Sequence, residues 1–245
     1  MTWPIPIGEP QSAIQDSWAC SNFALAHSIE SQIKFHTGKT VNISERFFAI
    51  MSGTIPGIGN SISKNFATAE KYGWLENTDC PHPTGSWTNA EYYSFPITDE
   101  LLAKARKNQD EWDLDYKIGL SDSPETLKLL DTAPLIAWVP KSTPNHFVEV
   151  ISPDLRFDSY LPYIRPLGSV QNFSQFIIKR KDTMKLVKNG QTFYLEGNKG
   201  YFGINKPEFL NLLIKITDQV EERPPIGQQL GVVETVSDVF EIKDS

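Results

Sequence analysis

The order of helical and extended segments constrains this fold more than any other feature of the sequence. Over roughly the first 130 residues, apolar side chains recur at spacings of three and four, which is typical of amphipathic helices. Short runs rich in β-branched and aromatic residues follow at 134–139, 146–151 and 155–160, and turn residues separate them. This order predicts an α+β fold with a helical N-terminal half and an antiparallel β half, rather than alternating βαβ units.

Five helices are expected in the N-terminal half. The first runs from Cys20 to His36 and ends before a Thr-Gly turn. Ser44 is a good N-cap for a second helix, which continues to Gly53. The other three are predicted at 62–74 with Gly73 as its C-terminal cap, at 99–112, and at 123–131 with Ser123 as N-cap and Pro124 in the first turn.

Shifts in composition divide the chain into three predicted parts. Residues 1–170 form the main domain, which holds the helices and strands named above. Residues 176–217 predict a small ββα module, because two or three short strands precede a helix that Asn205 would cap. Residues 218–245 form an acidic C-terminal tail with seven acidic and two basic residues, a composition typical of a solvated extension.

The net charge of −7 and the distribution of apolar residues exclude several classes of partner. Thirty acidic residues outnumber 23 basic ones, which argues against nucleic acid. No run approaches the length of about 18 apolar residues that a membrane-spanning helix needs, so no membrane partner is expected. The first residues lack the basic and apolar regions of a signal peptide, which predicts a cytoplasmic or virion-associated protein.

The two cysteines, Cys20 and Cys80, are too few for a disulfide framework, which favours a reducing compartment. They are also too few for a cysteine-only zinc site. A metal site built on Cys80 and His82 would need two more ligands, and none stands at a suitable spacing. We therefore expect neither a metal nor a cofactor, and we interpret Cys80 as a structural thiol.

Cys20 stands at the predicted start of a helix with an apolar face. Unpaired backbone N–H groups and the helix dipole stabilise a thiolate there, and the thiolate is the nucleophilic form of cysteine. Gln15 lies five residues earlier, where its amide could donate toward an oxyanion beside the Cys20 N–H. His146 opens a strand, and a histidine at the end of a core strand can reach a helix N-terminus. Placement alone also fits a small buried cysteine, so both interpretations of Cys20 stay open at this point.

The residues around these positions resemble those of the papain-like cysteine proteases. The segment from Gln15 to Ala24, QDSWACSNFA, resembles the glutamine loop and nucleophile helix of that family. Further similarity covers 29–46, 57–81 and 133–139, which resemble a helix with its Thr-Gly turn, a Gly-rich segment with the next helix, and the first β-domain strand. The resemblance implies a papain-like fold with the active site in a cleft between its halves, Cys20 as nucleophile and His146 as the catalytic histidine.

The resemblance also implies a third catalytic residue after the strand that follows His146. The family typically has asparagine, serine and tryptophan there, and this sequence has Asp158-Ser159-Tyr160. Aspartate can accept the imidazole N–H and favours the charged imidazolium, and Tyr160 would supply the aromatic cover. Glu149 is the alternative acceptor, but its position three residues along the strand puts it on the opposite face, which favours Asp158. Compact members with Asp-Ser-Tyr resemble those of bacteria and their viruses.

The same resemblance indicates where substrate would bind. Trp18 replaces a glycine of the family, and Ser17 replaces a cysteine that forms a disulfide there. The glycines at 57 and 59 would let an extended substrate approach the backbone, or they form a simple turn before the next helix. The residues predicted to bind substrate are Trp18, Ala19, Gly57, Ile58, Gly59, Asn145 and Tyr160.

Three functions compete at this stage. The leading hypothesis is thiol-dependent hydrolysis of peptide bonds in a protein or peptide substrate, through a Cys20 thiolate and a His146 imidazolium. The same triad could instead cut peptidoglycan or isopeptide bonds, with the module at 176–217 as a targeting or wall-binding unit. The third hypothesis is an inactive papain-like structural or binding protein of a phage particle, in which Trp18 would crowd the substrate groove.

Overall fold

A computed structural model describes residues 1–7, 16–140, 146–160 and 162–181, and the strand segments 185–189, 192–197, 200–203 and 220–222. The chain divides into two units, Met1–Arg180 and Lys181–Ser245. The first unit contains α1 (Cys20–Thr37), α2 (Glu45–Met51), α3 (Ile62–Tyr72), α4 (Asn89–Tyr93), α5 (Asp99–Gln109), α6 (Pro124–Lys128) and the short 3-10 helix η1 (Leu129–Asp131). Its strands are β1 (Trp112–Leu120), β2 (Leu135–Val139), β3 (His146–Val150), β4 (Leu155–Phe157), β5 (Ile164–Pro166) and β6 (Gln171–Arg180).

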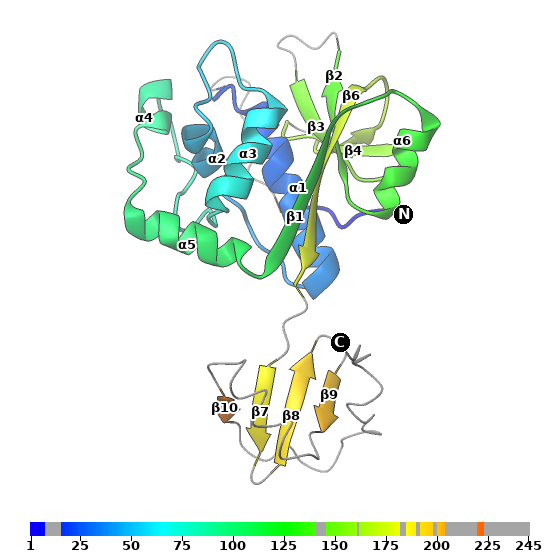
Figure 1. The fold of residues 1–245 in the computed structure, drawn as a ribbon. Helices are drawn as coiled ribbons and strands as arrows, with labels where there is room; N and C mark the ends of the chain where they lie inside the picture. The colour runs from blue at the N-terminus through cyan, green and yellow to red at the C-terminus, as the bar shows by residue number, and fades with distance from the viewer. Residues whose placement is uncertain are drawn as a thin grey trace, which may run out of the picture. The chain divides into compact units, whose positions relative to one another are not determined.

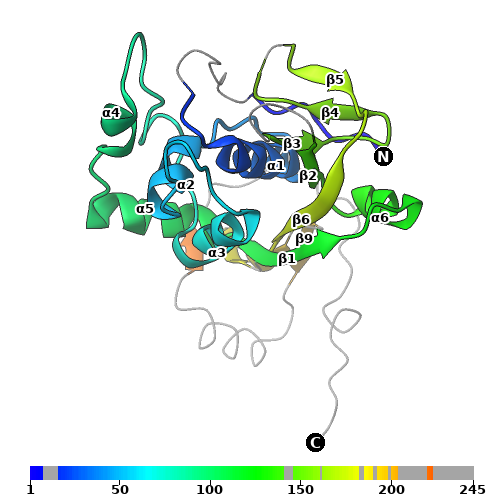
Figure 2. The same ribbon diagram turned by 90° about the horizontal axis from the view of Figure 1, so that it is seen from above.

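Helix α1 lies at the centre of the first unit, between the other N-terminal helices and the sheet (Figures 1 and 2). It packs against α2 on one side and β3 on the other, and it is buried without a break from Ser21 to Ile33. The sequence predicts one apolar face, whereas the whole circumference of this helix is enclosed. Its buried polar side chains must therefore find partners inside the protein.

Gln32 shows how one of these polar side chains is satisfied. Its amide nitrogen donates to the Phe176 carbonyl at 2.9 Å, and its amide oxygen accepts the Ile178 N–H, also at 2.9 Å. Both partners lie on β6, so the middle of α1 is hydrogen-bonded directly to the sheet. The helix that carries Cys20 at its N-terminus is thus held rigidly against the β half.

The sheet of the first unit is antiparallel throughout, with the strand order β1-β6-β2-β3-β4-β5. The predicted combination of a helical N-terminal half and an antiparallel β half is confirmed. Strands β2, β3 and β4 correspond to the three segments expected from composition. Their neighbouring order brings the start of β3 and the end of β4 close to one another.

The prediction of a helix through residue 112 was wrong. Helix α5 ends at Gln109, and Trp112 begins β1, which pairs with β6 from Trp112 opposite Arg180 to Leu120 opposite Phe173. The segment WDLDYKIGL alternates apolar and polar residues, which is the pattern of a strand with two different faces. The first 130 residues are therefore not wholly helical, because they also supply one strand of the sheet.

Capping residues place several helix boundaries where the sequence predicts them. Ser44 and Ser123 accept backbone N–H groups in the first turns of α2 and α6. Gly73 ends α3 with a φ of +75°, and a Cβ there would lie 2.1 Å from the Ala105 carbonyl oxygen. Only glycine fits this position, because the end of α3 meets the backbone of α5.

The second unit contains a four-stranded sheet with the order β10-β7-β8-β9, built from β7 (Lys185–Asn189), β8 (Thr192–Gly197), β9 (Gly200–Gly203) and β10 (Val220–Glu222). Strand β10 runs parallel to β7, so part of the predicted acidic tail belongs to this sheet. Residues 176–180, predicted in the module, instead belong to β6 of the first unit. The predicted helix after Asn205 and residues 223–245 lie outside the described residues.

Candidate active site

Cys20 is the first residue of α1 and is partly exposed. Ala19 precedes it as the N-cap residue, and the Ala19 carbonyl accepts the N–H groups of Asn22 and Phe23 at 2.8 and 3.0 Å. The N–H groups of the first helical residues have no intrahelical partner, and the helix dipole concentrates positive potential there. The Cys20 sulfur is therefore at a position that favours an anion.

His146 connects Cys20 to the β half. It is the first residue of β3, pairs with Val139 of β2, and is 6% exposed. Its Nε2 lies 2.7 Å from Oδ1 of Asp158, and Cys20 is its other side-chain hydrogen-bond partner. Burial opposes protonation of the imidazole, but these hydrogen bonds and the negative charges of Asp158 and Cys20 raise its pKa to about 9.

Asp158 follows β4 and is 2% exposed. Its Oδ1 accepts the Tyr160 backbone N–H at 3.0 Å, and its Oδ2 lies 3.6 Å from Nε of Arg165. Burial opposes ionisation, yet the bonds from His146 and Tyr160 and the nearby positive charges lower the pKa of Asp158. The carboxylate is thus held charged beside the imidazole.

Glu149, the other acceptor considered from the sequence, lies elsewhere. It is fully buried, and the groups that act on its charge are Ser31 and Glu30 of α1. Burial, with the repulsion from Glu30, raises its pKa well above the ordinary value. The acceptor that contacts His146 is Asp158.

The ring of Tyr160 covers the histidine. Its centroid lies 4.9 Å from that of His146, and the Tyr160 carbonyl accepts from Nη2 of Arg165 at 3.3 Å. A ring at this distance limits the access of water to the imidazole and to its bond with Asp158. Tyr160 therefore stands where the resemblance predicts aromatic cover.

The loop before Cys20 has an unusual backbone. Trp18 has a φ of +60°, in the left-handed region, which costs a residue with a side chain about 1–2 kcal/mol. The Trp18 N–H donates to Oδ1 of Asp16 at 2.7 Å, and the hydroxyl of Tyr93 donates to the Ser17 carbonyl. These two contacts hold the conformation that glycine would adopt freely, and Ala19 beside it is completely buried.

The turn at 57–59 lies next to this loop. A Cβ on Gly59, whose φ is +88°, would lie 3.4 Å from the Trp18 carbonyl oxygen. Ile58 at the tip of the turn is 78% exposed. The Asn60 carbonyl accepts from the Ser21 hydroxyl at 3.3 Å, which ties the turn to the residue after Cys20. The structure therefore places Gly59 beside Trp18, whereas Ala19, which was also predicted to bind substrate, is completely buried and closed to it.

Two of the predicted site residues, Gln15 and Asn145, lie outside the described residues. The sequence pattern gives no role to Asp16 or Tyr93, although both contact the loop before Cys20. The sequence pattern also gives no role to His27, which is seven residues from Cys20 and thus two turns along the same face of α1. Burial lowers its pKa to about 3, and the charges of Asp158 and His146 act on it, so it lies close to these two residues.

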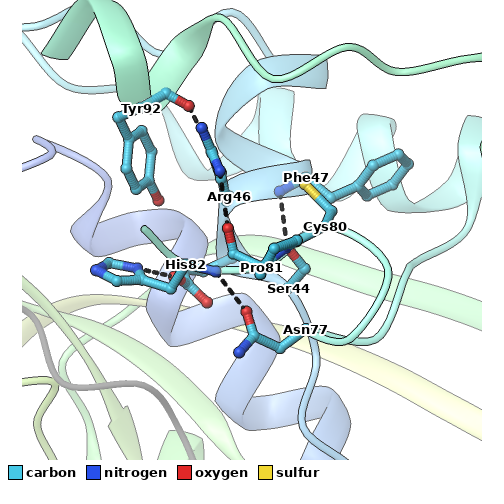
Figure 3. A network of polar contacts seen from close by, with 9 residues as sticks. Ser44, Arg46, Phe47, Asn77, Cys80, Pro81, His82 and Tyr92 are labelled. Atoms are coloured by element: carbon cyan, nitrogen blue, oxygen red, sulfur yellow. Dashed lines mark hydrogen bonds and ion pairs between the residues drawn. The ribbon is translucent and has the colours of Figure 1, made fainter. Parts of the chain in front are cut away.

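Cys80 lies in a separate polar network, shown in Figure 3. Its carbonyl accepts from the Ser44 hydroxyl at 2.5 Å, and the Arg46 guanidinium donates to the Pro81 and Tyr92 carbonyls at 2.8 and 2.7 Å. The thiol of Cys80 is completely buried, and burial raises its pKa to about 11. It is a structural thiol, whereas Cys20 is the partly exposed one.

Comparison with known proteins places this geometry in a known fold. A scan against models of protein families finds no match, and neither does a comparison with curated protein sequences. The clostridial cysteine protease Cwp84, solved after propeptide cleavage, matches with a TM-score of 0.51 and 11% identity over 75% of this chain and 58% of that one. The proform of Amb a 11, a cysteine protease and major ragweed pollen allergen, matches with a TM-score of 0.50 and 14% identity over 73% and 64%.

The chain has a papain-like cysteine protease fold. It spans about three fifths of the length of these two proteases. Helix α1 carries Cys20 to His146, the first residue of β3. Among the described residues, no group of three or more metal-binding side chains comes together, and no helix is long and apolar enough to cross a membrane.

Proposed function

We propose that this chain is a cysteine peptidase that hydrolyses peptide bonds of protein or peptide substrates. The observation that carries the proposal is the series of side-chain contacts from Cys20 to His146 to Asp158, with Cys20 at the N-terminus of a buried helix. A partly exposed thiol, an imidazole and a carboxylate in this order are the parts that thiol-dependent acyl transfer requires. The papain-like fold supports the same assignment.

In the first half of the reaction, the Cys20 thiolate attacks the carbonyl carbon of the peptide bond. The carbon–nitrogen bond then breaks, and the His146 imidazolium gives its proton to the leaving amine. The first product is a free amine, and the acyl group stays on sulfur as a thioester. Asp158 keeps Nδ1 of the ring directed at sulfur, because Nε2 is occupied by the carboxylate.

In the second half, a water molecule attacks the thioester carbon while His146, now neutral, takes one of its protons. The carbon–sulfur bond breaks, and the products are a carboxylic acid and the regenerated thiolate–imidazolium pair. The Cys20 N–H stands at a helix N-terminus and would donate to the oxyanion in both halves. The amide of Gln15 would be the second donor.

Substrate would bind in an extended conformation beside the turn at 57–59, with Trp18 on the same side and Tyr160 on the side of the histidine. Ala19 is completely buried, so it would not contact substrate itself. Asn145, which precedes His146 in the sequence, is the remaining candidate contact. The exposed Ile58 gives this region an apolar surface. A substrate side chain that packs on Ile58 would be favoured, because burial of apolar surface stabilises the complex.

The proposal is tested with a peptide library, a denatured protein and purified peptidoglycan as parallel substrates. We expect the protein to cleave peptide bonds, Cys20→Ala to abolish the cleavage, and the matched variant Cys80→Ala to retain it. Iodoacetamide at pH 6 should label Cys20 stoichiometrically and spare the buried Cys80. Peptide cleavage that survives in Cys20→Ala would refute the proposal, and release of peptidoglycan fragments without peptide cleavage would assign the triad to a different bond.

A further inference from the structure

Asp16 contacts two parts of the active site that come from distant segments of the chain. Its Oδ1 accepts the Trp18 N–H at 2.7 Å, within the loop that leads into α1. Its carboxylate also accepts a hydrogen bond from the Tyr160 hydroxyl, which lies beyond β4 in the β half. One carboxylate is therefore bonded to the loop of the nucleophile and to the cover of the histidine.

Tyr160 is engaged at three points besides this bond. Its N–H donates to Oδ1 of Asp158 at 3.0 Å, the same oxygen that lies 2.7 Å from His146 Nε2. Its carbonyl accepts from Arg165 at 3.3 Å, and its ring lies 4.9 Å from the His146 ring. The position of Tyr160 therefore determines both the orientation of Asp158 and the shielding of the imidazole.

Two phenols, those of Tyr93 and Tyr160, lie near the Asp16 carboxylate. Burial, together with the negative charge of Asp16, raises the pKa of both phenols. Both hydroxyl groups therefore keep their protons and remain donors. The Tyr93 hydroxyl donates to the Ser17 carbonyl, between Asp16 and the left-handed Trp18.

We propose that Asp16 is a positioning residue that joins the Cys20 loop to the Tyr160 cover and so sets the placement of the thiol relative to the His146 ring. This inference rests on the peptidase function proposed above. The contacts of Asp16 described above are with Trp18 and Tyr160 rather than with the sulfur or the imidazole. Asp16 acts through Trp18, whose peptide precedes Ala19 and Cys20, and through Tyr160, which covers His146.

The structural reason is that the two halves contribute separate groups to one reaction. Cys20 comes from α1, and His146 comes from β3. A misplacement of reacting groups by about 1 Å can cost roughly a hundredfold in rate. Without the Asp16 carboxylate, Trp18 loses the acceptor that holds its left-handed backbone and Tyr160 loses its contact across the site. Both sides of the thiol–imidazole pair then become free to shift.

The test compares Asp16→Ala, Asp16→Asn, Tyr160→Phe and the double variant Asp16→Ala/Tyr160→Phe. Tyr160→Phe keeps the ring over His146 and removes only the hydroxyl. Asp16→Asn keeps an oxygen that can accept from Trp18. Asp113→Ala on the exposed face of β1 and Tyr163→Phe, whose ring stacks on Phe157, are the matched controls. Circular dichroism and thermal melting establish that each variant is folded.

Two readouts are measured, kcat and KM on a peptide substrate and the rate of Cys20 alkylation by iodoacetamide between pH 5 and 10. We expect Asp16→Ala to lower kcat about tenfold with KM within about twofold, and Tyr160→Phe to lower kcat about fivefold. The double variant should be no slower than Asp16→Ala, because the two residues act through one contact. Asp16→Asn should recover most of the lost activity, and both controls should match the unmodified protein.

The alkylation profile separates failure of this inference from failure of the peptidase function, because it needs no substrate. Asp16→Ala and Tyr160→Phe should lower the alkylation rate at pH 6 and shift its pH profile, whether or not the protein cleaves peptides. Unchanged alkylation and kcat in folded Asp16→Ala would overturn the inference while leaving the function intact. A double variant whose loss of kcat equals the product of the two single losses would also overturn it. If Asp16→Ala does not fold, Tyr160→Phe decides the outcome by the same two readouts, and unchanged kcat and alkylation in that variant would overturn the inference.

Discussion

His146 and Asp158, twelve residues apart in the chain, are joined by a hydrogen bond of 2.7 Å between Nε2 and Oδ1. The antiparallel pairing of β3 and β4 brings them together, since His146 begins one strand and Asp158 follows the other. The pairing leaves Nδ1 of the ring available to Cys20. The orientation of the imidazole is therefore a direct consequence of strand register.

The first prediction concerns Asp158. Its negative charge helps to raise the pKa of His146 to about 9, so we expect the alkaline limb of the kcat/KM profile near that pH. Asp158→Asn keeps an acceptor but removes the charge, and it should move this limb to lower pH and reduce kcat/KM about tenfold. Asp158→Ala should reduce kcat/KM about a hundredfold. Asp154→Asn, exposed in the turn before β4, is the control, and an alkaline limb that stays in place would contradict the assignment.

The second prediction concerns Arg46, which is 7% exposed at the start of α2 (Figure 3). Its guanidinium donates to the carbonyls of Tyr92, Pro81 and Glu91 at 2.7, 2.8 and 2.6 Å. Lysine lacks the planar fork that reaches several acceptors, so Arg46→Lys should lower the free energy of unfolding by about 2–3 kcal/mol. Urea denaturation measures this, with exposed Arg106→Lys as the control. If the free energy of unfolding fell by less than about 0.5 kcal/mol, as for a substitution at the surface, the three hydrogen bonds of Arg46 would not stabilise the fold as expected.

Local signals in the sequence predicted the helical part of the fold well. Ser44 and Ser123 are caps that act on their own first turns, so a pattern over a few residues is sufficient to place them. Helix α4 was not predicted, although Thr88 and Glu91 form a capping box that marks its start. Strand β1 was not predicted either, because its first residue, Trp112, was assigned to the preceding helix and the alternation of apolar and polar residues from 112 to 120 was overlooked.

The site was predictable where a sequence motif carries it, and not where distant contacts do. Cys20, His146 and Asp158 stand at matching positions of a family pattern, and the structure brings them together. The link between Asp16 and Tyr160 joins residues far apart in the chain. No local spacing records such a contact, because it depends on how α1 and the sheet pack in three dimensions.

The third prediction concerns Glu149, whose pKa in the folded protein is raised well above its ordinary value by burial and by the repulsion from Glu30. Because the folded pKa lies above the ordinary value of 4.5, the folded state loses stability as pH rises from about 4.5 through the folded pKa. Each unit of difference destabilises by about 1.4 kcal/mol at higher pH. Glu149→Gln should therefore unfold like the unmodified protein at pH 4 and be more stable at pH 8. Exposed Glu70→Gln is the control. If Glu149→Gln and the unmodified protein had the same free energy of unfolding at pH 4 and again at pH 8, Glu149 would not bind a proton on folding.

The fourth prediction concerns His27, which is buried beside Phe157 with ring centroids 4.8 Å apart. Its Nε2 has no hydrogen-bond partner among the described residues, and burial lowers its pKa from 6.5 to about 3. The unfolded protein therefore binds a proton that the folded protein does not, so stability is lost as pH falls from 6.5 toward 3.

His27→Leu removes this proton-binding group and keeps an apolar side chain against Phe157. Between pH 6.5 and 3, its free energy of unfolding should fall less steeply than that of the unmodified protein. The two proteins should diverge by about 1.4 kcal/mol for each pH unit in this range. Urea denaturation across this pH range measures the difference. His36→Leu, at the exposed end of the same helix, should change the acid sensitivity far less, and parallel curves for His27→Leu and the unmodified protein would mean that His27 is already protonated in the fold.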